Sequence, residues 1–118
     1  MPETERERVI DEARRLPLLD GVFSVLFYNR HRRGLGRPPH ALPIVLAEVF
    51  PAATETDLAE VSDRVTSLLS SAYRFGDALL AHNFTNYEAT KETLAAEHPG
   101  FSAKSYEETI NYGCFQAR

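Results

Sequence analysis

The sequence predicts an all-α protein: a compact bundle of five or six helices around a long central helix. Three observations predict this class. Apolar residues recur at helical spacing along almost the whole chain, one central stretch keeps that spacing for three heptads, and helix-capping patterns recur in the C-terminal half. With 118 residues and a charged fraction of 25%, the chain is expected to form a single domain, residues 1–118.

The first half of the chain is expected to begin with an amphipathic surface helix over residues 4–16, which Pro17 interrupts. Two apolar segments follow, residues 22–28 and residues 43–50. Their spacing suits helices, but they are also aromatic and β-branched enough to form buried strands. We favour two helices, with Pro43 in the first turn of the second, and a two-stranded hairpin is the alternative.

The clearest pattern predicts the central helix at about residues 56–82. Thr54 or Thr56 can cap its start, and Asn83 is suited to a left-handed stop at its end. Seven apolar residues follow one another at alternating steps of three and four, a seam typical of helix-on-helix packing. They are Leu58, Val61, Val65, Leu68, Ala72, Phe75 and Leu79.

Two further helices are predicted in the C-terminal part. The sequence TNYE at residues 85–88 has the spacing of a capping box, so a helix should begin at Asn86. It should end at HPG, residues 98–100, because proline cannot continue a helix and glycine suits the exit. The last helix is expected to start at Ser102 or Ser105.

Composition argues against several classes of protein. No stretch approaches the roughly 20 apolar residues of a membrane span, and the charged N-terminal region lacks the apolar core of a signal peptide. The single cysteine, Cys114, rules out an internal disulfide and lies on an apolar stripe, where a thiol is usually buried and unreactive. We therefore expect a cytoplasmic protein that does not interact with membranes.

Residues 30–40, RHRRGLGRPPH, concentrate positive charge in a chain of net charge −4. Guanidinium groups match phosphate oxygens, but the segment has neither the P-loop nor the dinucleotide-binding glycine pattern. Aromatic residues that could stack on bases are not interleaved with the arginines. A polar connector after a helix is the simplest interpretation. The candidate partner- or anion-binding residues are Arg30, Arg32, Arg33, Arg37 and His40.

No catalytic residue, metal site or cofactor is predicted. Asp77 and His82 are five residues apart, so they point about 140° from each other on a helix and do not converge. No HExxH or ExxH spacing occurs. The C-terminal half is instead rich in aromatic residues, which are favoured at interfaces. The candidates for self-association, as a twofold dimer, are Tyr73, Tyr106, Tyr112 and Phe115.

These observations favour a non-enzymatic interaction protein, a regulatory or assembly protein that binds another protein and forms a homodimer. One alternative is a nucleic-acid-associated accessory protein that uses the arginines of residues 30–40. A second alternative is an enzyme whose site is assembled between subunits, with His82, Asp77 or His40 in a shared pocket.

Overall fold

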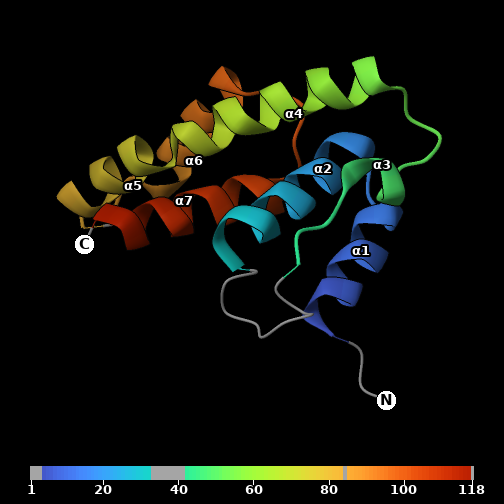
Figure 1. Ribbon diagram of the computed structural model, residues 1–118. Coiled ribbons are helices and arrows are strands. Elements are labelled where there is room, and N and C mark those ends of the chain that lie inside the picture. The colour runs from blue at the N-terminus through green and yellow to red at the C-terminus, as the bar shows by residue number, and fades with distance from the viewer. Residues whose placement is uncertain (1–3, 33–41, 84, 118) are drawn as a thin grey trace. The chain divides into compact units, whose positions relative to one another are not determined.

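The computed structural model describes residues 4–32, 42–83 and 85–117, which form helices, turns and short extended connections (Figure 1). No described residue lies in a β-strand, so the predicted all-α class is confirmed. Each helix within these ranges is too short or too polar to cross a lipid bilayer. The chain divides into two units, Met1–Val65 and Thr66–Arg118, which we describe one at a time. The single domain expected from chain length stays a prediction.

The first unit begins with α1 (Glu5–Arg15) and α2 (Leu18–Phe27). The side chain of Thr4 caps α1 by accepting a hydrogen bond from a backbone N–H of the first turn at 3.1 Å. A Cβ at Gly21 of α2 would lie only 2.6 Å from the carbonyl oxygen of Ala13 in α1. Glycine at this position therefore allows the two helices to pack closely.

The two ambiguous segments of the first unit have different outcomes. The first is helical, because α2 continues directly into the π-helix η1 (Tyr28–Arg32). The second stays extended as far as Val45 and then forms the single-turn helix α3 (Leu46–Val49). The prediction that Pro43 lies in the first turn of a helix is therefore wrong, and so is the alternative of a hairpin of two strands.

Side chains explain why the second segment is extended. The carboxamide of Asn29 pairs with both backbone groups of Ile44: Nδ2 donates to the carbonyl at 2.9 Å and Oδ1 accepts from the N–H at 2.8 Å. Arg6 of α1 donates to the carbonyls of Leu42 and Pro43 at 3.3 and 3.2 Å. These bonds satisfy backbone groups of residues 42–44 without a helix. The core of the unit is formed by Ala13, Val25, Tyr28, Ile44 and Val49.

The predicted central helix forms as two helices, α4 (Glu55–Ser70) and α5 (Ala72–Ala81), separated at Ser71. As predicted, Thr54 caps the start by accepting a hydrogen bond at 3.0 Å, and Asn83 has the left-handed φ of 50° after the end. The seam continues across the break, since five of its seven residues are buried: Val65, Leu68, Ala72, Phe75 and Leu79.

The second unit contains α5, α6 (Tyr87–Glu97) and α7 (Ala103–Ala117). The N-cap of α6 is Asn86 rather than Thr85, so the predicted capping box is not formed, and the hydroxyl of Thr85 instead donates to the carbonyl of His82 at 2.7 Å. Helix α6 ends at Glu97, just before the HPG sequence, as predicted, and Gly100 in the connection has a positive φ of 101°. The hydroxyl of Ser102, rather than Ser105, caps α7 at 3.4 Å.

Helices α5 and α7 lie side by side and run in the same direction (Figure 1). Helix α6 runs in the opposite direction and leads the chain from the end of α5 back to the start of α7. Their contact is backbone to backbone. A Cβ at Gly113 would overlap the Ala72 carbonyl oxygen, and a Cβ at Gly76 would overlap the carbonyl of Gly113. Cys114 is buried as predicted, with its Sγ 3.9 Å from the carbonyl oxygen of Gly76. Small residues thus determine how closely these helices approach.

Candidate functional site

The structure describes only part of the predicted anion-binding segment. Arg30 and Arg32 fall within η1, and the side chain of Arg30 is exposed. Arg33, Arg37 and His40 lie outside the described residues. Binding of an anion or an acidic partner by this segment therefore stays a prediction.

His31 is the titratable group of η1 whose surroundings affect its protonation. Its ring meets the ring of Phe27 edge-on, with centroids 5.0 Å apart. Burial lowers the pKa of His31 below its ordinary value of 6.5, and the nearby charge of Arg30 lowers it further. The imidazole is therefore expected to stay neutral at neutral pH.

The four predicted self-association residues have different surroundings. Tyr106 is only 6% exposed, and its hydroxyl accepts from the Phe101 N–H at 3.2 Å and donates to the His98 carbonyl at 2.7 Å. It therefore fixes the connection between α6 and α7. Tyr73 and Phe115 are 54% and 65% exposed.

Helical geometry indicates where the exposed rings lie. Successive residues of a helix are rotated by about 100°, and Ala72 and Gly113 mark the facing sides of α5 and α7. Tyr73 and Tyr112 are then both on the side of the α5–α7 pair opposite to α6. The ring of Phe115 lies 6.1 Å from that of Tyr112, on the outer side of α7. We call Tyr73, Tyr112 and Phe115 the aromatic face.

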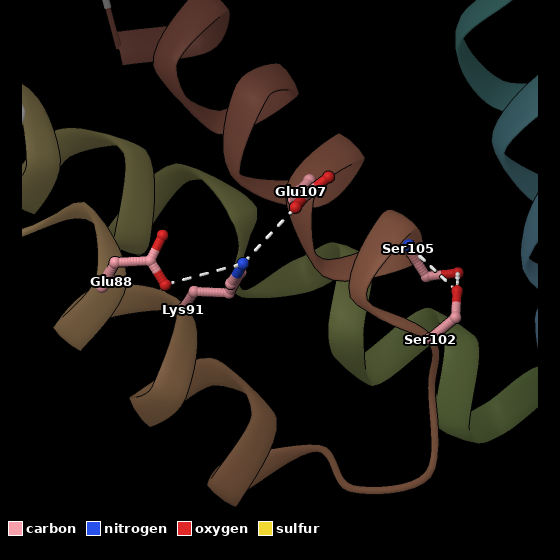
Figure 2. A network of polar contacts seen from close by, with 5 residues as sticks. All are labelled: Glu88, Lys91, Ser102, Ser105 and Glu107. Atoms are coloured by element: carbon pink, nitrogen blue, oxygen red, sulfur yellow. Dashed lines mark hydrogen bonds and ion pairs between the residues drawn. The ribbon is translucent and has the colours of Figure 1, made fainter.

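The opposite side of α7 is linked to α6 by charge (Figure 2). The Nζ of Lys91 lies 3.4 Å from a carboxylate oxygen of Glu107 and 3.7 Å from one of Glu88. The hydrogen bond to Glu107 raises the pKa of Lys91. Burial, followed by the charge of Glu107, raises the pKa of the neighbouring Tyr87. The ion pair between Lys91 and Glu107 therefore links α6 to α7.

A groove of about 250 Å³ lies between α5 and α6. Its lining residues carry no charge and are mostly apolar at the surface: Phe75, Ala78, Asn86, Ala89, Thr90 and Thr93. Neither His82 nor Asp77 is among them. Within the described part of the chain, no group of three His, Cys, Asp or Glu residues is placed to hold a metal ion.

The sequence pattern did not single out this groove. Thr90 and Leu94 are the buried residues of α6, and a threonine four residues before a leucine is unremarkable on a helix. The signal that was available is the absence of charge from positions 89, 90 and 93, whereas residues 88, 91 and 92 around them are charged.

No protein-family model, curated protein or solved structure matches this chain. Its class is therefore defined by its fold alone, as an all-α protein.

Proposed function

We propose that this chain is a non-enzymatic interaction protein, with a regulatory or assembly role, that forms a twofold dimer through the aromatic face. The observation that supports the proposal is the exposure of Tyr73 and Phe115 on a closely packed pair of helices. Large rings fixed on helices bury much area on association while few torsions become ordered. Aromatic residues are also enriched in protein interfaces.

A second copy is the partner we favour. In a twofold dimer the same patch is used by both subunits, so each exposed ring contributes to the contact twice. Tyr73 and Tyr112 are placed at the same side of the helix pair, and the Tyr hydroxyls can remain hydrated at the rim of the contact.

Sedimentation velocity over a range of micromolar concentrations tests the proposal. The wild-type chain should sediment as a dimer of the 13.3-kDa protomer. The double variant Y73Q/F115Q should shift the equilibrium towards monomer by roughly tenfold or more, because glutamine keeps helix propensity and removes the rings.

The matched control is L42Q/V45Q, which removes two exposed apolar side chains of the first unit that are 55% and 49% exposed. This variant should dimerise like the wild type. A wild-type chain that stays monomeric throughout the range, or an equal effect of both double variants, would refute the proposal.

A further inference from the structure

Helix α6 is anchored by few buried side chains. Its buried residues are Thr90 and Leu94, of which Leu94 is the apolar one and has no exposed surface. Helix α7, with 15 residues against the 11 of α6, has six buried residues: Ser105, Tyr106, Thr109, Ile110, Gly113 and Cys114. Helices of this length owe most of their stability to packing against their neighbours. Helix α6 is therefore held less firmly than α7.

The two ends of α6 are attached unequally. At the C-terminal end, Glu97 accepts a hydrogen bond from Arg74 of α5 at 3.0 Å, and the hydroxyl of Tyr106 donates to the carbonyl of His98 at 2.7 Å. At the N-terminal end, the side chain of the N-cap residue Asn86 makes no capping hydrogen bond. Its Oδ1 is buried without a hydrogen-bond partner in the part of the chain that the structure describes. Because an unpaired buried oxygen destabilises the folded state, the N-terminal end is the weaker one.

An ion pair joins the N-terminal half of α6 to α7 (Figure 2). The Nζ of Lys91 lies 3.4 Å from a carboxylate oxygen of Glu107, and the two side chains are 22% and 44% exposed. An ion pair at this exposure stabilises only weakly, and added salt screens it. The attachment of this half of α6 should therefore depend on ionic strength.

Cys114 lies on the side of α7 that α6 covers. It follows Gly113, which faces α5, so it is rotated by about 100° to the side opposite Tyr112. Burial raises the pKa of Tyr87 in the first turn of α6, the charge of Glu107 raises it further, and the thiol of Cys114 is near enough to add to this effect. Cys114 is only 6% exposed. A reagent can therefore reach its thiol only when part of the second unit opens.

We propose that α6 is a lid that opens from its N-terminal end by local unfolding, while α5 and α7 stay packed and the ion pair of Lys91 with Glu107 limits how often it opens. Elements that move are drawn from the segments with few buried contacts. The backbone contact of Gly76 with Gly113 involves no residue of α6, so it persists in the open state. The proposal does not depend on dimerisation, because the aromatic face is on the other side of the α5–α7 pair.

The single cysteine makes the opening measurable in the full chain. Labelling of Cys114 by N-ethylmaleimide, an uncharged thiol reagent, is followed by mass spectrometry in water and in low concentrations of urea. Labelling should be at least roughly tenfold faster than global unfolding allows, and it should depend less steeply on urea than global unfolding does. Amide hydrogen exchange should show the same opening for residues 90–93, whereas residues 109–113 of α7 stay protected.

The role of the ion pair is tested by charge. E107Q removes the negative partner of Lys91 and should speed labelling roughly two- to fivefold. E60Q makes the same change on the exposed surface of α4 and should leave the rate unchanged. Added sodium chloride should speed labelling of the wild type and have less effect on E107Q. The salt series keeps the test decisive if a variant does not fold.

The direction of opening is tested at Asn86. N86S removes the unpaired buried oxygen and supplies a favourable N-cap residue, so it should slow labelling roughly threefold or more. N111S makes the same replacement on the exposed surface of α7 and should leave the rate unchanged.

Labelling no faster than global unfolding would overturn the lid. Exchange of residues 109–113 together with α6 would also overturn it, because α7 would then be opening. Equal rates for E107Q and E60Q without an effect of salt would overturn the role of the ion pair, and faster labelling of N86S would overturn opening from the N-terminal end. Far-ultraviolet circular dichroism verifies that each variant folds.

Discussion

Gly76 of α5 and Gly113 of α7 meet backbone to backbone, and a Cβ on either one would overlap the main chain of the other helix. Two parallel helices can approach this closely only where neither has a side chain at the point of contact. The contact sets the positions from which Tyr73 and Phe115 project, so it supports the surface that we propose for dimerisation.

The variant G113A should destabilise the protein by about 2 kcal/mol or more. Alanine favours a helix over glycine by up to ~1 kcal/mol, but the added Cβ would overlap the Ala72 carbonyl, which is main chain and cannot turn aside. Urea unfolding measures the change. The control A59G removes a Cβ from the exposed surface of α4. Its expected loss of stability, about 1 kcal/mol, therefore measures the effect of helix propensity alone. An unchanged or more stable G113A would show that the helices do not meet at this glycine.

The variant N29A should destabilise the first unit, because it leaves the N–H and C=O of the buried Ile44 without partners. An unsatisfied buried polar group costs about 1–3 kcal/mol, so a loss of at least ~2 kcal/mol is expected on urea unfolding. N111A makes the same change on the exposed surface of α7 and should stay within about 0.5 kcal/mol of wild type. Equal effects of the two variants would contradict the pairing of the Asn29 side chain with the backbone of Ile44.

The Gly76–Gly113 contact and the Asn29–Ile44 pairing also show which parts of the fold can be predicted from the sequence alone. The apolar periodicity correctly predicts the helical class and the buried stripe on which Cys114 lies, and the tolerance of asparagine for positive φ correctly predicts the left-handed stop at Asn83. It does not predict that Gly76 faces Gly113, because periodicity gives the direction of a side chain and not the helix that it meets. The pairing of Asn29 with Ile44 is likewise a contact across 15 residues of chain, which local propensity does not contain.

The break at Ser71 has a local cause that the apolar pattern does not register. The hydroxyls of Ser70 and Ser71 donate to the carbonyls of Thr66 and Leu68 at 2.8 and 2.7 Å, and such bonds bend helices. The apolar seam keeps its spacing on both sides of the break, so the sequence predicts one continuous helix. Apolar spacing shows which side chains share a face of the helix. It does not show where serine hydroxyls compete with backbone N–H groups for the carbonyls of the preceding turn.

The candidate sites were harder to predict than the fold. Tyr106 belongs to the aromatic group by composition, yet its hydroxyl makes two hydrogen bonds within the second unit. The groove between α5 and α6 is lined by Asn86, a residue type common at helix starts, and its Oδ1 gains meaning only because it is buried without a hydrogen-bond partner in the described part of the chain. Both distinctions depend on burial, which a single sequence does not report for individual polar atoms.

The variant Y106F should lower stability by about 1–2 kcal/mol, because it removes the group that joins the Phe101 N–H to the His98 carbonyl. Thermal or urea unfolding measures this loss. Y73F removes a hydroxyl from an exposed tyrosine of α5 and should change stability by less than about 0.5 kcal/mol. If Y73F were as costly as Y106F, the hydroxyl of Tyr106 would not be holding the connection between α6 and α7.

Stability should fall as the pH is lowered through the range in which His31 of an unfolded chain takes up a proton. Burial lowers the folded-state pKa below 6.5, so between that pKa and about 6.5 the unfolded chain binds more protons than the folded one. Protons then favour unfolding, and the contribution of His31 is complete only above its unfolded pKa. Urea unfolding at about pH 7.5 and pH 5.5 should show wild type losing more stability than H31Q. Proton NMR of the His31 ring measures the same pKa directly, and a midpoint at or above 6.5, or parallel losses in the two proteins, would contradict the prediction.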